Sequence, residues 1–109
     1  MLPNADRAVV DDEKVYGYLL SPSHPVGRFK AAFFRSFGFS VERWELLRDA
    51  LLEHGRRGPC EQGEASAFGQ KYEVCDILVG PTGRSALLMT IWIVRADEDF
   101  PRLVTAYPG

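Results

Sequence analysis

The spacing of hydrophobic residues changes along the chain, from a helical period in the first half to strict alternation in the second. Within residues 12–20, the apolar positions Val15, Tyr18 and Leu19 fall on one face at helical spacing. Residues 26–37 predict an amphipathic helix, because four aromatic residues recur on one stripe: Phe29, Phe33, Phe34 and Phe37.

A third helix is expected over residues 41–54, where apolar residues line one side and acidic residues the other. Gly55 is expected to end this helix. His54 falls in its last turn, where a positive charge complements the helix dipole. Residues 55–67 are polar and glycine-rich without a clear period, which predicts an irregular connection.

The second half of the chain predicts strands. Apolar and polar residues alternate over residues 72–77, and the segment Gly80–Gly83 is typical of a hairpin turn. Residues 84–95 are apolar on both faces, which favours a central strand, and residues 102–107 form a closing strand. Helices followed by an antiparallel meander predict an α+β fold. We expect one domain over residues 1–109, with N-terminal helices packed on an antiparallel sheet of three or four strands.

Composition narrows the function classes. The formal net charge of -2 argues against sequence-independent coating of DNA, which needs a broad cationic surface, but not against a cleft that binds a few phosphates. Cys60 and Cys75 have no short-spaced ligand pair, so neither a metal nor another cofactor is expected. Free thiols without a secretory signal indicate a reducing, cytoplasmic compartment. No apolar run approaches membrane-spanning length, so no membrane partner is expected.

Candidate chemistry gathers in Ser23–Phe34, a turn punctuated by proline and glycine that leads into the second predicted helix. It carries His24, Arg28 and Lys30. Such a turn can present an imidazole, cations and free backbone N–H groups to an anion. Metal-free cleavage of a phosphodiester needs these groups, because one must move a proton and others must neutralise charge. The same residues also fit an ordinary helix start, with His24 in a half-exposed loop and the stem of Lys30 packed on phenylalanine rings.

Several blocks of sequence carry a family resemblance: residues 2–5 with 19–31, residues 68–72, and residues 80–84 with 91–94 and 100–107. Together they closely resemble a bacterial domain family of unknown function. Its members look like small stand-alone proteins or C-terminal modules of larger chains in toxin-like and phage-like settings. The resemblance covers nearly the whole chain, and it brings no established activity.

A second resemblance implies an activity as well as a fold. Helices followed by an antiparallel sheet, with a last strand reading Leu103-Val104-Thr105-Ala106-Tyr107-Pro108, resemble the barnase–EndoU–colicin–RelE group of metal-independent ribonucleases. The resemblance implies that His24 and Lys30 match the helical motif of that group, and that Thr105 and Tyr107 match its final strand.

Two hypotheses follow. The resemblance implies a metal-independent endoribonuclease of toxin type that cleaves RNA by attack of the 2′-hydroxyl, with His24 taking the proton and Lys30 and Thr105 completing the catalytic set. Three further residues are expected to bind the substrate: Arg84, Arg95 and Tyr107. The alternative is a non-catalytic binding or oligomerisation module associated with a toxin system. It is favoured by the acidic net charge and by Phe29, which stands where some relatives have a histidine. The expected partners are RNA, a cognate antitoxin or immunity protein, or a second copy of this chain.

Overall fold

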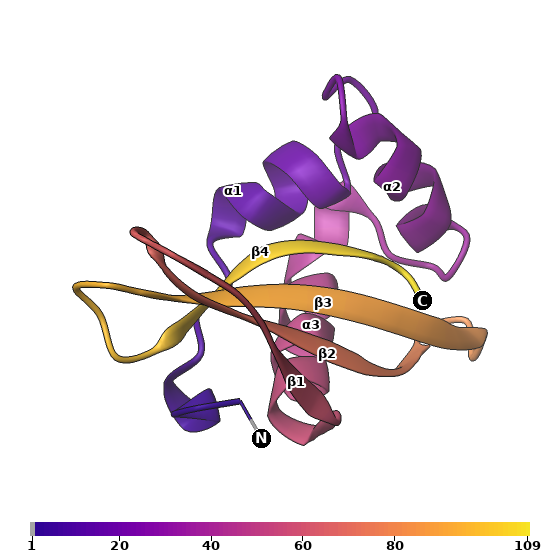
Figure 1. Ribbon diagram of the computed structural model, residues 1–109. Coiled ribbons are helices and arrows are strands. Elements are labelled where there is room, and N and C mark those ends of the chain that lie inside the picture. Colours follow the sequence, from indigo (N-terminus) through magenta and orange to yellow (C-terminus); the bar gives the residue numbers. More distant parts are fainter. Residues whose placement is uncertain (1) are drawn as a thin grey trace.

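The computed structural model describes residues 2–109, in which helices pack against one face and one edge of a four-stranded antiparallel sheet (Figure 1). The helical elements are η1 (Ala5–Arg7), α1 (Asp12–Lys14), η2 (Val15–Leu19), α2 (Gly27–Arg35), η3 (Val41–Arg43) and α3 (Trp44–Arg57). The strands are β1 (Cys60–Ser66), β2 (Gly69–Val79), β3 (Ser85–Arg95) and β4 (Pro101–Pro108). The long helix α3 runs along the back of the sheet, while α1 and α2 lie beside β4 (Figure 1).

The sheet has the order β1-β2-β3-β4, so β3 is an internal strand as the sequence predicts. The α+β architecture with N-terminal helices and a C-terminal antiparallel sheet is confirmed. Trp92 and Leu88 of β3 are fully buried and belong to one hydrophobic core with Leu47 and Leu51 of α3. Val9 makes an isolated parallel bridge with Arg102 of β4, which anchors the N-terminal segment to that edge.

The first expected helix is present, but its second half is a π-helix. Residues 12–14 form α1, and Val15–Leu19 continue as η2 with a wider turn, in which the N–H of Leu20 donates to the carbonyl of Val15 over 2.8 Å. Val15 and Leu19 are fully buried. A π-turn is rare and often occurs at functional sites, because it rotates the following side chains relative to an α-helix.

The predicted stripe of phenylalanines on α2 is only partly correct. Phe34 and Phe37 are buried and Phe33 packs against the core, but Phe29 is 70% exposed. Within α2, Phe34 shares the buried face with Gly27 and Ala31, so that the three recur at i, i+4 and i+7. The two small residues let the helix approach its neighbours closely, and Phe29 lies on the opposite side.

The third helix extends past its predicted end to Arg57. Gly55 does not terminate it but lies inside it, against the ring of Trp92. A Cβ atom at Gly55 would lie 2.5 Å from Cζ2 of Trp92, so the glycine is required by close packing between α3 and β3.

The prediction of an irregular connection over residues 55–67 is wrong, because β1 occupies Cys60–Ser66. This edge strand pairs with β2 and has a register irregularity between Gln62 and Ala65. Most of its side chains are exposed. Main-chain hydrogen bonds to β2 hold the strand in place. Because these bonds do not depend on side-chain type and most side chains of β1 face solvent, its sequence shows no apolar alternation.

Candidate functional site

Tyr18 lies at the centre of a polar cluster where η2, α2 and β4 meet. Its hydroxyl is 3.1 Å from Oγ1 of Thr105, and its ring packs edge to face on the imidazole of His24 with centroids 4.9 Å apart. The ammonium of Lys30 is 6.0 Å from the ring centroid of Tyr18 and 5.4 Å from that of Tyr107. We call these five residues the Tyr18 cluster. The structure thus brings His24 and Lys30 of the N-terminal half together with Thr105 and Tyr107 of the last strand.

A β-bulge in β4 orients Thr105. Leu103 pairs with Trp92, whereas Thr105 pairs with Ile91, so the register shifts by one residue between them. Leu103 and Ala106 are both buried even though they are three residues apart, which regular alternation would not allow. The bulge therefore turns Thr105 away from the core and toward Tyr18, as bulges next to functional sites often do.

Close packing between α2 and η2 positions His24 and Lys30. Gly27, the first residue of α2, lies against the backbone carbonyl of Tyr18, and a Cβ atom there would overlap that oxygen. Only glycine permits this approach. It brings the first turns of α2, with Lys30, against the ring of Tyr18.

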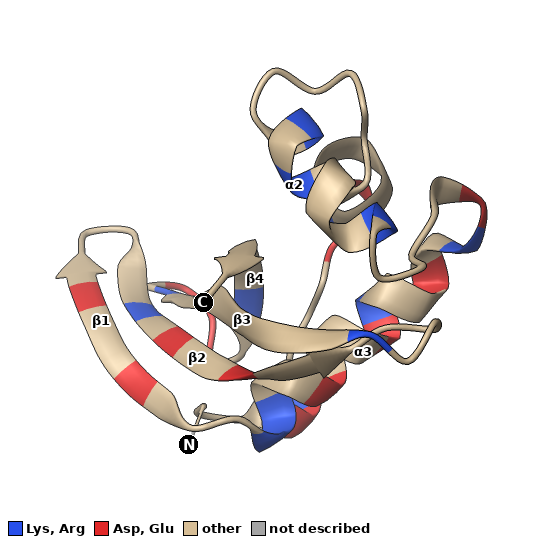
Figure 2. Cartoon of the chain, turned by 90° about the vertical axis from the view of Figure 1, so that its right-hand side faces the viewer, with Lys and Arg blue, Asp and Glu red and all other residues tan. Residues whose placement is uncertain are grey.

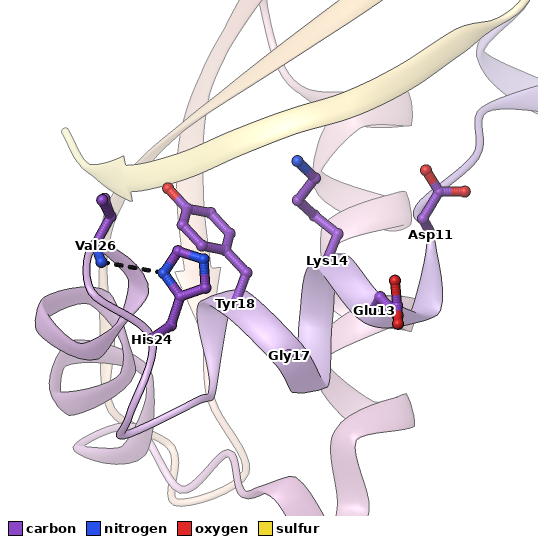
Figure 3. Close-up of a pocket in the computed structure, with 7 residues that line it drawn as sticks. All are labelled: Asp11, Glu13, Lys14, Gly17, Tyr18, His24 and Val26. Carbon is purple, nitrogen blue, oxygen red and sulfur yellow. Dashed lines mark hydrogen bonds between the residues drawn. The ribbon is translucent and has the colours of Figure 1, made fainter.

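His24 caps the start of α2 with its side chain. Nδ1 accepts hydrogen bonds from the backbone N–H groups of Val26 and Gly27, each over 3.0 Å; Figure 3 draws the bond from Val26. Because Nδ1 accepts, the proton of the neutral ring lies on Nε2, which is left to donate. Acting as a base through Nε2 would require a proton on Nδ1 and the loss of both bonds. The geometry therefore favours hydrogen-bond donation by His24.

A groove of about 610 Å³ opens beside Tyr18 and His24 (Figure 3). Its other lining residues are Asp11, Glu13, Lys14, Gly17 and Val26. In Figure 3 the two carboxylates lie at one end, His24 and Val26 at the other, and Tyr18 between them. The ammonium of Lys14 is 5.5 Å from the ring centroid of Tyr18, so the middle of the groove carries positive charge.

The charges of individual elements differ in sign, and the net charge is negative. The charged residues of α2 are all basic, whereas β1 and β2 carry mostly acidic residues (Figure 2). The basic residues of α2 are Arg28, Lys30 and Arg35. The α2 side of the groove therefore suits an anionic ligand better than the net charge suggests, whereas Asp11 and Glu13 make its other end acidic.

Arg84 and Arg95 flank β3 at its opposite ends. They are 11 residues apart along an extended chain, or roughly 35 Å at the usual strand rise. The guanidinium carbon of Arg84 is 5.0 Å from the ring centroid of Phe37, and Arg95 pairs with Gly69. The structure does not bring either of them into the Tyr18 cluster, and both cannot contact one phosphate group.

Sequence reasoning assigned no function to Tyr18, which it placed on an apolar helix face. A tyrosine at such a position is typical of half-buried packing, so its spacing carries no functional signal. The π-turn and the contact with Thr105 become visible only in the folded chain.

The second histidine has a structural role that differs from the prediction. His54 is buried, with Nδ1 3.0 Å from the hydroxyl of Thr90 and Nε2 2.9 Å from the carbonyl of Leu88. The indole N–H of Trp92 donates to Thr90 over 2.8 Å, which completes the chain of hydrogen bonds. Burial lowers the pKa of His54 below its ordinary value. The expectation of a charged residue complementing the helix dipole is therefore wrong, because burial in the core disfavours the charged form of the ring.

Three other kinds of site bear on function: metal centres, cysteine thiols and membrane-spanning helices. Between residues 2 and 109, no group of three or more His, Cys, Asp or Glu side chains is placed to hold a metal ion. Cys60 and Cys75 are free thiols. No helix in this part of the chain is long and apolar enough to cross a membrane. Polar side chains from distant segments converge most clearly in the Tyr18 cluster.

These features define a small α+β domain with a polar groove at the edge of its sheet. The chain belongs to the family described as a domain of unknown function (DUF6883), which matches residues 1–109. No curated protein matches it. Among solved structures, it is similar to a chain of a contact-dependent growth inhibition toxin–immunity protein complex from Klebsiella pneumoniae 342. The TM-score is 0.70 at 18% identity, and the match covers 95% of each chain, which shows a shared fold.

Proposed function

We propose that this chain is a metal-independent endoribonuclease of toxin type. The observation that carries the proposal is the Tyr18–Thr105 hydroxyl pair, with His24 and Lys30 packed around the same ring. Cleavage without a metal needs a proton donor, a path for the departing proton and positive groups for the charged phosphate. Hydroxyl, imidazole and ammonium groups supply these functions within one cluster.

In the proposed reaction, the 2′-oxygen of a nucleotide attacks the adjacent phosphorus, and the bond to the 5′-oxygen of the next nucleotide breaks. The products are a 2′,3′-cyclic phosphate and a free 5′-hydroxyl. One proton leaves the attacking oxygen and one joins the departing oxygen, so no other reactant is consumed.

The geometry supports a role for each residue of the cluster. The ammonium of Lys30 neutralises the phosphate and gives a proton to the departing 5′-oxygen. His24 donates from Nε2 to a non-bridging phosphate oxygen, because its Nδ1 is held by the start of α2. The Tyr18–Thr105 hydroxyl pair orients the phosphate and passes the 2′-proton to water in the groove. This scheme replaces the sequence-based role of His24 as the proton acceptor.

Binding outside the cluster is assigned to the remaining candidates. Tyr107 holds Lys30 in place through its ring and borders the phosphate. Arg84 and Arg95 bind parts of the RNA away from the scissile phosphate, since they flank opposite ends of β3.

A toxin system is the proposed setting. The fold is shared with a chain from a toxin–immunity protein complex, which supports a cognate immunity protein or antitoxin as the partner. Expression of the chain without such a partner should then inhibit bacterial growth, and substitution of Lys30 should relieve the inhibition.

Incubation of the purified chain with RNA in EDTA tests the activity directly. We expect cleavage to a 2′,3′-cyclic phosphate, blocked by a 2′-deoxy group at the scissile nucleotide. His24→Ala should slow it by roughly 10²–10³-fold, the usual value of a positioned donor to developing charge. Phe68→Ala, at an 80% exposed residue in the β1–β2 connection, is the matched control and should cleave normally. Intact RNA together with harmless expression would contradict the proposal.

One observation favours the alternative of a binding module. The outer face of the sheet exposes aliphatic side chains, with exposed fractions of 49% for Ile77, 59% for Val79 and 44% for Leu87. A protein partner or a second copy of the chain would cover them. If RNA stays intact, Ile77→Glu should weaken that association in light scattering or in co-purification with the partner.

A further inference from the structure

The first turn of α2 presents an uncovered aromatic ring beside the groove. Phe29 is 70% exposed, and the guanidinium carbon of Arg28 lies 4.8 Å from its ring centroid. Val26 lines the groove and is 56% exposed. Val26 is the N-cap of α2, and residues three apart at a helix start are neighbours, so Phe29 lies next to a residue that lines the groove.

Packing does not explain this phenylalanine. The buried face of α2 is formed by Gly27, Ala31 and Phe34, on the opposite side of the helix. The ring of Phe29 therefore contributes little to the core, while its face remains available to a ligand.

We infer that Phe29 and Arg28 form a subsite in which a base of single-stranded RNA stacks next to the Tyr18 cluster. The inference rests on the proposed function and names the form of its substrate. Bases of any sequence stack on aromatic rings, and arginine adds a cation over the ring and a contact for the backbone. Only unpaired bases leave a face free for such stacking.

Charge and connectivity favour RNA as the occupant. Every charged residue of α2 is basic, which complements a phosphate backbone. The same turn also holds the histidine, because Val26 and Gly27 donate to its Nδ1 and Arg28 donates its backbone N–H to the carbonyl of His24 over 3.0 Å. In this proposal, the phosphate at Nε2 of His24 and the base on Phe29 belong to the same strand of RNA.

Binding of an uncleavable strand tests the subsite apart from catalysis. The probe is a fluorescein-labelled 2′-O-methyl oligonucleotide, followed by anisotropy with wild type, Phe29→Ala, Phe29→Trp and the control Phe68→Ala. Loss of one stacked base should raise Kd roughly 5- to 100-fold in Phe29→Ala. Phe29→Trp should retain binding because it keeps a stacking face, and Phe68→Ala should match wild type. A self-complementary duplex of the same chemistry should bind more weakly than the single strand.

The outcomes separate this inference from the proposed function. Cleavage by wild type with an unchanged Kd and KM in Phe29→Ala would overturn the subsite and leave the ribonuclease in place. Absence of cleavage with Phe29-dependent binding would overturn the ribonuclease and leave the subsite as a nucleic-acid contact. Equal affinity for duplex and single strand would also overturn the stacking role.

Discussion

The hydroxyl groups of Tyr18 and Thr105 lie 3.1 Å apart, although 87 residues separate them along the chain. Two local irregularities create this pair. The π-turn of η2 sets the direction of the tyrosine, and the bulge in β4 turns the threonine away from the core. Both departures from regular geometry occur at the Tyr18 cluster, where polar side chains from distant segments meet.

Removal of either hydroxyl should impair cleavage more than stability. Thr105→Val and Tyr18→Phe should each slow RNA cleavage by roughly 10²-fold, because the pair orients the phosphate and moves a proton. The hydrogen bond itself contributes only about 1 kcal/mol to folding, so urea midpoints should change little. The double variant should be no slower than either single one, since the two groups act together. Thr82→Val, in the β2–β3 turn, should cleave at the wild-type rate; a comparable loss there would contradict the assignment.

Substitution of the basic residues should have two different kinetic effects, depending on whether the residue acts on the scissile phosphate or binds another part of the RNA. Lys30→Ala should lower kcat by roughly 10²–10⁴-fold, because the ammonium lies inside the Tyr18 cluster and acts on the reacting group. Arg84→Ala and Arg95→Ala should mainly raise KM, since both residues lie outside the cluster. Steady-state kinetics on a short fluorescent RNA measures both parameters. An equal loss of kcat in all three variants would contradict this division.

The buried His54 should make stability depend on pH. Burial lowers the pKa of this imidazole from its ordinary value of 6.5, so the unfolded chain binds a proton more readily than the folded one. Its contribution is complete above about pH 6.5 and falls as the pH drops toward the lower folded pKa. Urea unfolding between pH 7.5 and 5 should show this loss, and His54→Gln should reduce the slope in that window. If the free energy of unfolding of the variant depended on pH as steeply as that of the wild type, the pH dependence would come from groups other than His54.

Close packing makes Gly55 intolerant of a side chain. Gly55→Ala would place Cβ 2.5 Å from the ring of Trp92, and overpacking of this kind costs about 1–3 kcal/mol. Gly17→Ala is the matched control, because no atom lies within 4 Å of the added Cβ, and it should leave stability equal or higher. Thermal melts of both variants measure the difference. Equal melting temperatures would show that α3 shifts away from the sheet at little cost.

Local spacing was sufficient to predict most of the elements. Alternation over residues 72–77 and 84–95 and the hairpin between them determined the antiparallel pairing of β2 and β3. Strand β1 could not be found in this way, because an edge strand with exposed side chains is held by main-chain bonds that leave no apolar pattern. On α2 only Phe29 was misassigned to the buried face, and Gly27 was missed, since its close contact with the carbonyl of Tyr18 depends on which segment lies opposite.

For the candidate site, the sequence by itself determined which chemical groups are present: an imidazole and cations at a helix start and hydroxyls in the last strand. Tertiary structure alone decided that Tyr18 joins them through Thr105, and that Arg84 and Arg95 stay outside. The physical reason is that residue type and short-range spacing are local properties. The bulge in β4 and the contact between Tyr18 and Thr105 depend instead on the pairing and packing of segments that meet only in the folded chain.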